Sequence, residues 1–182
     1  VEGYVMRDAA RRHSNWRSER SLDELLEESG VVGLSGIDTR ALTRKLRTQG
    51  AMRGGVFSGD ELEGRSDADL VEVVRSIPDM AGASFVDQVT IHEPITFRPD
   101  GESRGTVVAL DLGIKGATPR HMVERGLTVH LLPASATIDD IVSYSPDAVF
   151  FSNGPGDPAT ADAQVVVLRE ILDRGIPYFG IC

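Results

Sequence analysis

The sequence TVVALDLGIKGATPRHMVERGLTVHLL, residues 106–132, decides the fold expected for the second half of the chain. It begins with a run of β-branched and apolar residues, continues with a helical stretch that Gly126 ends, and closes on a second apolar run. The same alternation continues downstream, with further strands expected at 148–151 and 176–180. Apolar strands that alternate with amphipathic helices are typical of an open parallel sheet covered by helices on both faces. We therefore expect an α/β fold for this half.

The first half carries local helix signals of a different kind. Ser21 and Glu24 have the spacing of a capping box, with the serine as N-cap of a helix. A second helix can be capped by Asp38 or Thr39, and a third is expected at about 67–76. With one short apolar strand between the first two helices, these signals predict part of a smaller α+β domain.

The change in pattern between the two halves predicts a domain boundary. Residues 91–105 are rich in proline, glycine and charge and have no helical period, which is typical of a linker. We therefore expect a first domain at residues 1–90, a linker at 91–105 and the sheet domain at 106–182. The chain starts without methionine and ends abruptly, and we expect it to be a piece of a longer protein.

Composition excludes several classes of function. The 182 residues carry 19 basic and 28 acidic side chains, a net charge of -9, which argues against nonspecific binding to nucleic acid or to an anionic membrane. No apolar run approaches the roughly 20 residues of a membrane span, and no signal peptide is recognisable. The single cysteine allows no internal disulfide, which fits a reducing compartment. We therefore expect a cytoplasmic protein.

One loop of unusual composition follows the expected strand 148–151. It reads SNGPGDP, residues 152–158, and lies where an open parallel sheet binds its ligands, outside the carboxyl ends of the strands. Gly154 and Gly156 have no Cβ, so a ligand can approach their backbone N–H groups closely. The loop suits an oxyanion or a carboxylate, although a tight strand-to-helix turn alone would also explain it.

The only cysteine, Cys182, follows the last expected strand. Gly180 lies two residues before it, and a small residue at this position is typical of a nucleophile elbow. A free cysteine is also a common buried residue, so packing is the alternative explanation. A nucleophilic cysteine needs a base, usually histidine. None of the four histidines falls on a loop at the expected carboxyl edge, so we expect the base to lie outside this chain; the histidines are His13, His92, His121 and His130.

Taken together, FFSNGPGDP at 150–158 and IPYFGIC at 176–182 resemble the class I, or triad, glutamine amidotransferases. The block GLSGIDTRALTR at 33–44, with GAMRG at 50–54, is similar to the small chain of carbamoyl-phosphate synthetase. The anthranilate and GMP synthetase glutaminases share the elbow but lack this block. The resemblance covers nearly the whole chain and implies a flavodoxin-like sheet domain preceded by a domain specific to the synthetase.

The resemblance implies a role for each candidate residue. Cys182 would be the nucleophile that attacks the side-chain amide of L-glutamine and forms a glutamyl thioester. The N–H of Gly154 would hold the oxyanion, together with the N–H of the residue after the cysteine, and Gly156 would contact the bound glutamine. The His and Glu of the family's triad lie downstream and are absent here, so we expect the 182-residue chain alone to be inactive.

The resemblance also implies partners and cofactors. The ammonia would pass to a large chain that makes carbamoyl phosphate from bicarbonate and two ATP, with Mg²⁺, for arginine synthesis, pyrimidine synthesis or both. No cofactor or metal is expected on this chain. Trp16 and the arginines Arg40, Arg44 and Arg47 are candidate contacts with the large chain, because Trp and Arg are frequent interface anchors; a solvated basic helix face with a core tryptophan is the alternative.

Two further hypotheses for the function agree with the sequence. The sheet domain could be a flavodoxin-like binding domain whose loop holds a phosphate, although neither the G-x-G-x-x-G nor the Walker spacing is present. The chain could also be a scaffold subunit without catalysis. Labelling of Cys182 by a glutamine-analogue electrophile separates a nucleophile from these alternatives.

Overall fold

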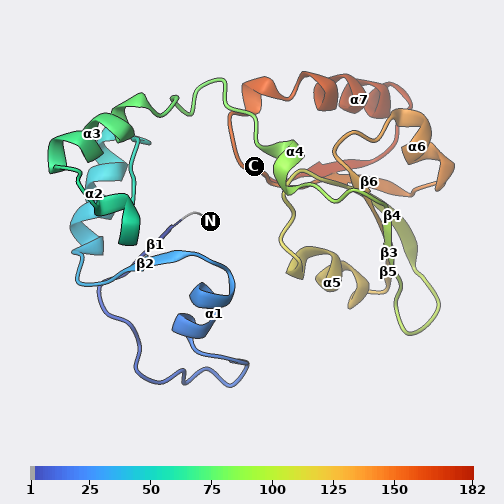
Figure 1. Ribbon diagram of the computed structural model, residues 1–182. Coiled ribbons are helices and arrows are strands. Elements are labelled where there is room, and N and C mark those ends of the chain that lie inside the picture. The colour runs from blue at the N-terminus through green and yellow to red at the C-terminus, as the bar shows by residue number, and fades with distance from the viewer. Residues whose placement is uncertain (1–2) are drawn as a thin grey trace. The chain divides into compact units, whose positions relative to one another are not determined.

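The computed structural model describes residues 3–182, which fall into two compact units divided between Asp79 and Met80 (Figure 1). Residues 80–90, expected in the first domain, lie in the second unit, which runs from Met80 to Cys182.

The second unit is built on a five-stranded sheet of order β3-β5-β4-β6-β7. Its strands are β3 (Ile95–Phe97), β4 (Gly105–Asp111), β5 (Leu127–Pro133), β6 (Ala148–Phe151) and β7 (Tyr178–Gly180). The strands β4 to β7 are parallel, as the alternation of strands and helices predicts, and β3 pairs antiparallel with β5. The expectation of an α/β fold with a mostly parallel sheet is therefore confirmed.

The strand β3 corrects the expected linker at 91–105. It is three residues long and lies between Pro94 and Pro99, which suits the edge of a sheet because proline donates no backbone hydrogen bond. Phe97 packs against the buried side chains beneath it. The segment is thus part of the sheet domain, although its composition resembles that of a linker.

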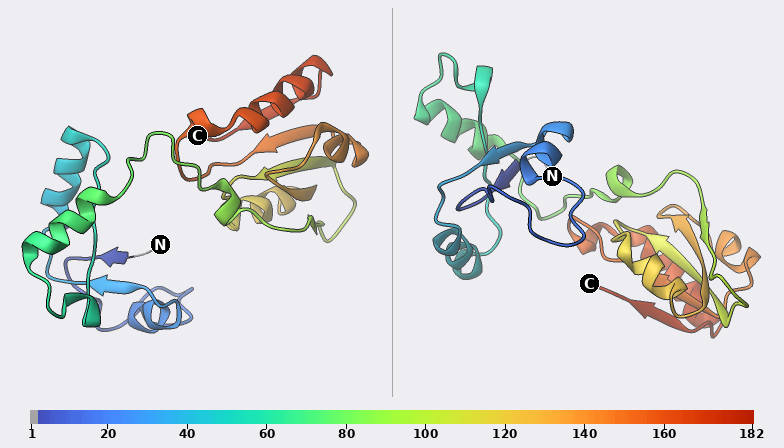
Figure 2. Two further views of the ribbon diagram at one scale, coloured as in Figure 1. Left: turned by 45° about the horizontal axis from the view of Figure 1, so that its top comes forward. Right: turned by 90° about the horizontal axis from the view of Figure 1, so that it is seen from below.

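Helices cover both faces of this sheet (Figures 1 and 2). They are α5 (Ala117–Val123) on one face and α6 (Ile138–Ser143) and α7 (Asp162–Asp173) on the other. Two short elements lie near the carboxyl ends of the strands, α4 (Val86–Val89) and the 3₁₀ helix η2 (Pro158–Thr160).

The core follows from the alternation of side chains along the central strand β4. Val108 and Leu110 belong to the buried cluster that includes Ile141 of α6 and Ile171 of α7. Their neighbours Val107 and Ala109 point to the opposite face, into the cluster beneath α5. Two closed clusters therefore hold the sheet and fix the carboxyl ends of its strands.

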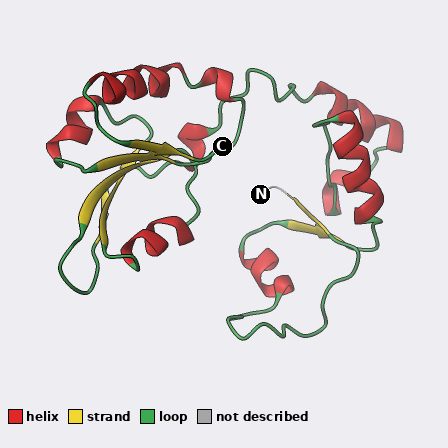
Figure 3. Cartoon of the chain, turned by 180° about the vertical axis from the view of Figure 1, so that it is seen from behind, coloured by secondary structure: helices red, strands yellow, loops and turns green. Residues whose placement is uncertain are grey.

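The first unit has a two-stranded parallel sheet and short helices (Figure 3). Its elements are β1 (Gly3–Val5), α1 (Leu22–Glu28), β2 (Val32–Leu34), α2 (Thr39–Gln49), the 3₁₀ helix η1 (Gly59–Leu62) and α3 (Asp67–Ser76). The three predicted helices are confirmed: α1 begins at a Ser21–Glu24 capping box, and α2 is capped by Asp38. No residue from 3 to 79 is buried.

Across residues 3–182, none of the helices combines the length and the apolar character that crossing a membrane requires.

Candidate functional site

The carboxyl ends of β6 and β7 lie side by side, because the two strands are parallel and Phe151 pairs with Gly180. The loop 152–158 follows β6, and Cys182 follows β7. Both contribute to one cavity of about 480 Å³, which Gly154, Gly156 and Cys182 line together. The structure thus brings the three candidate residues to one place, as expected from the strand order.

Cys182 has an exposed side chain and a strained backbone. Its φ of +77° lies in the left-handed region, which residues other than glycine, asparagine and aspartate seldom adopt. The side chain is exposed rather than packed among residues 3–182. An exposed residue with positive φ directly after a strand has two of the features of a nucleophile elbow.

The glycines of the loop are required by close packing of the protein itself. A Cβ at Gly154 would overlap the carbonyl oxygen of Leu112, and one at Gly156 would lie 2.6 Å from the carbonyl oxygen of Ala83. Gly156 also has φ +94°, a conformation that favours glycine. The space next to these glycines is therefore filled by backbone, which differs from the expectation that a ligand uses it.

The backbone N–H groups of Gly154 and Gly156 are nevertheless available to a ligand. Neither donates to any acceptor within residues 3–182. Gly154 is exposed and Gly156 is half-buried, and both lie in the wall of the cavity. Two unpaired N–H donors in one loop can bind an oxyanion or a carboxylate.

Asp157 fastens this loop to residues 82–85, a segment that the sequence reasoning missed. Its carboxylate accepts hydrogen bonds from the N–H groups of Gly82 (2.8 Å) and Ala159 (2.9 Å), and its own N–H donates to the carbonyl of Ala83 (2.8 Å). The hydrogen bond from Gly82, followed by that from Ala159, lowers the pKa of Asp157. The carboxylate therefore stays charged at neutral pH and holds the loop.

No histidine lines the cavity among the described residues. His121 is paired with Glu124 at 2.8 Å, and His130 contacts Thr96 Oγ1 at 2.9 Å and the ring of Tyr144. Burial, with a smaller contribution from a nearby arginine, lowers the pKa of His130. None of the described histidines thus lies beside Cys182 in this cavity.

Tyr178 also lines the cavity, and no sequence motif predicts a role for it. Its ring packs edge-on against Phe151, with centroids 5.3 Å apart, and a Cβ at Gly180 would overlap its hydroxyl group. Burial raises the pKa of Tyr178. A side chain at position 180 would therefore require the Tyr178 ring to shift.

A second hollow lies in the first unit, on α2. It is lined by Thr39, Arg40, Thr43, Arg44 and Arg47. The guanidinium groups of the three arginines make no hydrogen bond or ion pair with residues 3–182. Trp16 is 85% exposed, with the Arg17 guanidinium 4.5 Å from its ring centroid, so it is not a core residue of this unit.

Comparison with known proteins adds two family matches. Residues 1–56 match the model of the carbamoyl-phosphate synthase small chain, CPSase domain. Residues 108–182 match the model of glutamine amidotransferase class I, and this range contains the whole cavity loop and Cys182.

Curated relatives match the chain from end to end. It is 57% identical to the carbamoyl phosphate synthase small chain of Streptomyces coelicolor over 182 residues, which is all of this chain and 47% of the relative. It is 50% identical to the protein of that name from Mycobacterium tuberculosis over 185 residues, 49% of that relative. The chain thus spans about half the length of the curated relatives it matches. These matches place it in the carbamoyl phosphate synthase small-chain family, with a class I glutamine amidotransferase region at residues 108–182.

Proposed function

We propose that this chain carries the nucleophile and part of the substrate site of a glutaminase that supplies ammonia for carbamoyl phosphate synthesis. The observation that carries the proposal is the joint position of Cys182, Gly154 and Gly156 around one cavity at the ends of neighbouring parallel strands. The match of residues 1–56 favours the carbamoyl phosphate synthase family over other triad amidotransferases, which share only the second half.

The proposed reaction starts at the sulfur of Cys182. As a thiolate, it attacks the side-chain amide carbon of L-glutamine, and the carbonyl oxygen takes up the negative charge. The N–H of Gly154 donates to that oxyanion, and Gly156 contacts the glutamine. Preorganised donors of this kind act where charge develops, and the loss of one typically lowers kcat about 10²–10³-fold.

Collapse of the tetrahedral intermediate expels the amide nitrogen, which leaves as ammonia once it is protonated. Water then attacks the glutamyl thioester, which releases glutamate and regenerates the thiol of Cys182. The proton that leaves the thiol and returns to the nitrogen needs a base outside residues 3–182, because no histidine among them lines the cavity.

The ammonia would be used by a large chain, whose other substrates would be bicarbonate and ATP and whose cofactor would be Mg²⁺. The complex of the two chains would be cytoplasmic. The relatives' name, small chain, supports a larger partner. The exposed Trp16 and the unpaired arginines of α2 support a contact surface on the first unit. Arginine synthesis, pyrimidine synthesis or both would consume the product.

The nucleophile is tested by covalent labelling of the full-length protein in complex with its large chain. A chloroketone analogue of glutamine should label Cys182, the only cysteine of the 182 residues, and excess glutamine should protect it. Cys182→Ala should lower glutamine-dependent carbamoyl phosphate synthesis to background and leave synthesis from added ammonia intact, because ammonia bypasses the thioester. Glutamine-dependent synthesis that survives in Cys182→Ala would overturn the proposal.

The contact surface is tested by charge reversal on α2. Arg44→Glu with Arg47→Glu should weaken association with the large chain roughly tenfold or more, since arginines at interface centres often contribute over 1 kcal/mol each. Lys45→Glu is the matched control, because it reverses a charge on the same helix about 100° away from Arg44. Equal affinities for all variants, measured by titration of the two chains, would exclude this surface.

A further inference from the structure

A buried carboxylate at the end of β4 has no role in the reaction described above. Asp111 is 3% exposed and does not line the cavity. Its Oδ1 accepts hydrogen bonds from the N–H groups of Gly113 (2.9 Å) and Ile114 (2.8 Å), and its Oδ2 accepts one from Ile91 (2.9 Å). Three backbone donors compensate for the burial of the carboxylate and fix the loop 112–114 to the strand that it leaves.

Ser152 holds the same loop from the neighbouring strand. It follows β6 and is 4% exposed. Its Oγ accepts a hydrogen bond from the N–H of Leu112 at 2.9 Å and donates one to the carbonyl of Asn153 at 2.9 Å. Every backbone N–H of the loop 112–114 therefore donates to the side chain of either Asp111 or Ser152.

The loop 112–114 is in turn the surface on which Gly154 rests. A Cβ on Gly154 would overlap the carbonyl oxygen of Leu112. A Cβ on Gly113, where φ is +122°, would lie 3.0 Å from Cδ of Pro155 and 3.2 Å from Cα of Gly154. The backbone of 112–114 thus packs against Gly154 and Pro155 without room for a side chain between them, which limits how far the loop 152–158 can move independently.

We propose that Asp111 is a positioning residue for the N–H of Gly154. Asp111 sets the loop 112–114, this loop sets Gly154, and the direction of the Gly154 N–H toward the developing oxyanion follows. The inference rests on the proposed function, in which that N–H stabilises the tetrahedral intermediate. Ser152 shares the task, because it anchors Leu112, whose carbonyl contacts Gly154.

Two reactions of Cys182, attack on glutamine and alkylation, distinguish a positioning role of Asp111 from a merely structural one. Attack on glutamine places charge on an oxygen, which needs the donor in position. Alkylation of Cys182 by iodoacetamide forms a sulfur–carbon bond and releases iodide, and no oxygen gains charge. Both reactions need the thiolate, so a variant that only misplaces the oxyanion donor slows turnover and leaves alkylation unchanged.

The test uses Asp111→Asn in the full-length chain with its large chain. The amide keeps one acceptor oxygen, so one set of N–H groups faces a donor instead of an acceptor. We expect kcat for glutamine hydrolysis to fall about 10- to 100-fold, because a displacement of about 1 Å in a catalytic group has effects of this size. The KM for glutamine should change less than about threefold, and the rate of iodoacetamide alkylation should stay at the wild-type value.

Two further variants complete the design. Ser152→Ala should lower kcat in the same way but less, and the double variant should show less than the product of the two effects, because both act through one loop. Asp147→Ala is the matched control: this carboxylate accepts from the N–H of Thr106 (2.7 Å) at the opposite end of the same sheet. It should leave kcat unchanged.

The possible outcomes are distinct. A kcat of Asp111→Asn equal to that of the wild type, or a fall of kcat and alkylation in the same proportion, overturns the positioning role. The positioning role is also overturned if the effects of Asp111→Asn and Ser152→Ala on kcat simply multiply in the double variant. Glutamine hydrolysis that survives in Cys182→Ala overturns the proposed function itself and this inference with it, so the two failures are told apart.

Discussion

In the second unit both faces of β4 are covered by closed clusters of side chains, whereas no residue from 3 to 79 in the first unit is buried. The helices of the two units nevertheless begin with equally good local signals: capping boxes open α1 and α3 in the first unit and α6 in the second. Local hydrogen bonds thus define helices in both, but only the second unit adds a core.

The amphipathic helix α2 illustrates the difference in side-chain burial between the two units. Leu42 and Leu46 lie on one side of it and are 37% and 38% exposed, while Ile171 of α7 is fully buried. Because helical stability in proteins comes mostly from the packing of an apolar face, α2 gains less from its leucines than α7 gains from its isoleucine. Among residues 3–182, the buried side chains therefore gather around the central strands β4, β5 and β6, and the cavity lies at the carboxyl end of β6.

The largest expected effect comes from deleting a core side chain. Ile171→Ala should destabilise the second unit by about 2–5 kcal/mol, since it removes three buried carbons between α7 and the sheet. Leu42→Ala should destabilise the first unit by only about 1 kcal/mol, because its side chain is partly exposed already. Hydrogen exchange of β4 and α2 peptides during denaturant unfolding reports on the two units separately.

Equal losses of stability in Ile171→Ala and Leu42→Ala would contradict the difference between the two units. Such a result would mean that Leu42 lies in a closed core in the protein as it exists, and that the exposed faces of the first unit are covered there. A loss of stability confined to Ile171→Ala would support the conclusion that only the second unit has a closed core.

The parallel part of the sheet was predictable because its strands are continuous apolar runs, each separated from the next by a helix that ends at glycine or a polar turn. The strands β1 and β3 were not predictable. Each has three residues, and β3 lies between two prolines, so neither shows the alternation that marks a strand. Their pairing partners in β2 and β5 lie 29 or more residues away and decide their conformation.

The candidate site was predictable in its location and only partly in its construction. The rule that ligands bind at the carboxyl ends of parallel strands predicts from the sequence alone that Cys182 and the loop 152–158 lie together. What fills the space beside Gly154 and Gly156 depends on the carbonyl groups of Leu112 and Ala83, which belong to two other segments. Buried Asp111 and Ser152, each a polar residue at the end of an apolar strand, are the signal in the sequence that could have drawn attention to that support.

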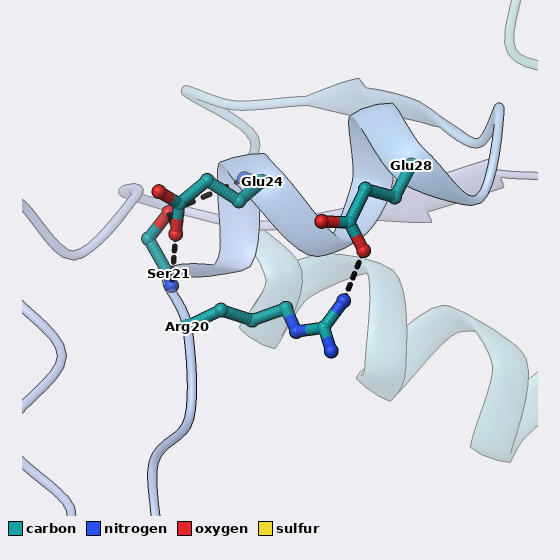
Figure 4. Close-up of polar contacts among 4 residues, drawn as sticks. All are labelled: Arg20, Ser21, Glu24 and Glu28. Carbon is teal, nitrogen blue, oxygen red and sulfur yellow. Dashed lines mark hydrogen bonds and ion pairs between the residues drawn. The ribbon is translucent and has the colours of Figure 1, made fainter.

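A smaller effect distinguishes the capping boxes of the two units. Figure 4 shows the one that opens α1. In α1 the N–H and the hydroxyl of Ser21 donate to Glu24 at 2.7 and 2.8 Å, and in α6 those of Thr137 donate to Asp140 at 2.8 and 2.7 Å. Ser21→Ala and Thr137→Ala should each destabilise their helix by about 1 kcal/mol. The loss should spread through the second unit, because α6 buries Ile138 and Ile141, but remain a local fraying of α1, which buries nothing.

The pH dependence of the two helices checks this assignment. The backbone hydrogen bond from Ser21, followed by that from its hydroxyl, lowers the pKa of Glu24 below 4.5, and the hydroxyl of Thr137, followed by its N–H, lowers the pKa of Asp140 below 3.8. A lowered pKa in the folded state means that the stabilisation is complete above the unfolded value and is lost as pH falls through the folded one. As pH falls through the lowered pKa of each carboxyl group, the NMR signals of its helix should therefore lose their helical shifts, locally at the start of α1 and together with the rest of the second unit for α6. In Ser21→Ala the α1 transition should move to higher pH, since the alanine keeps the N–H but lacks the hydroxyl and the pKa of Glu24 returns toward its usual value; a transition unchanged by the substitution would mean that another group controls it.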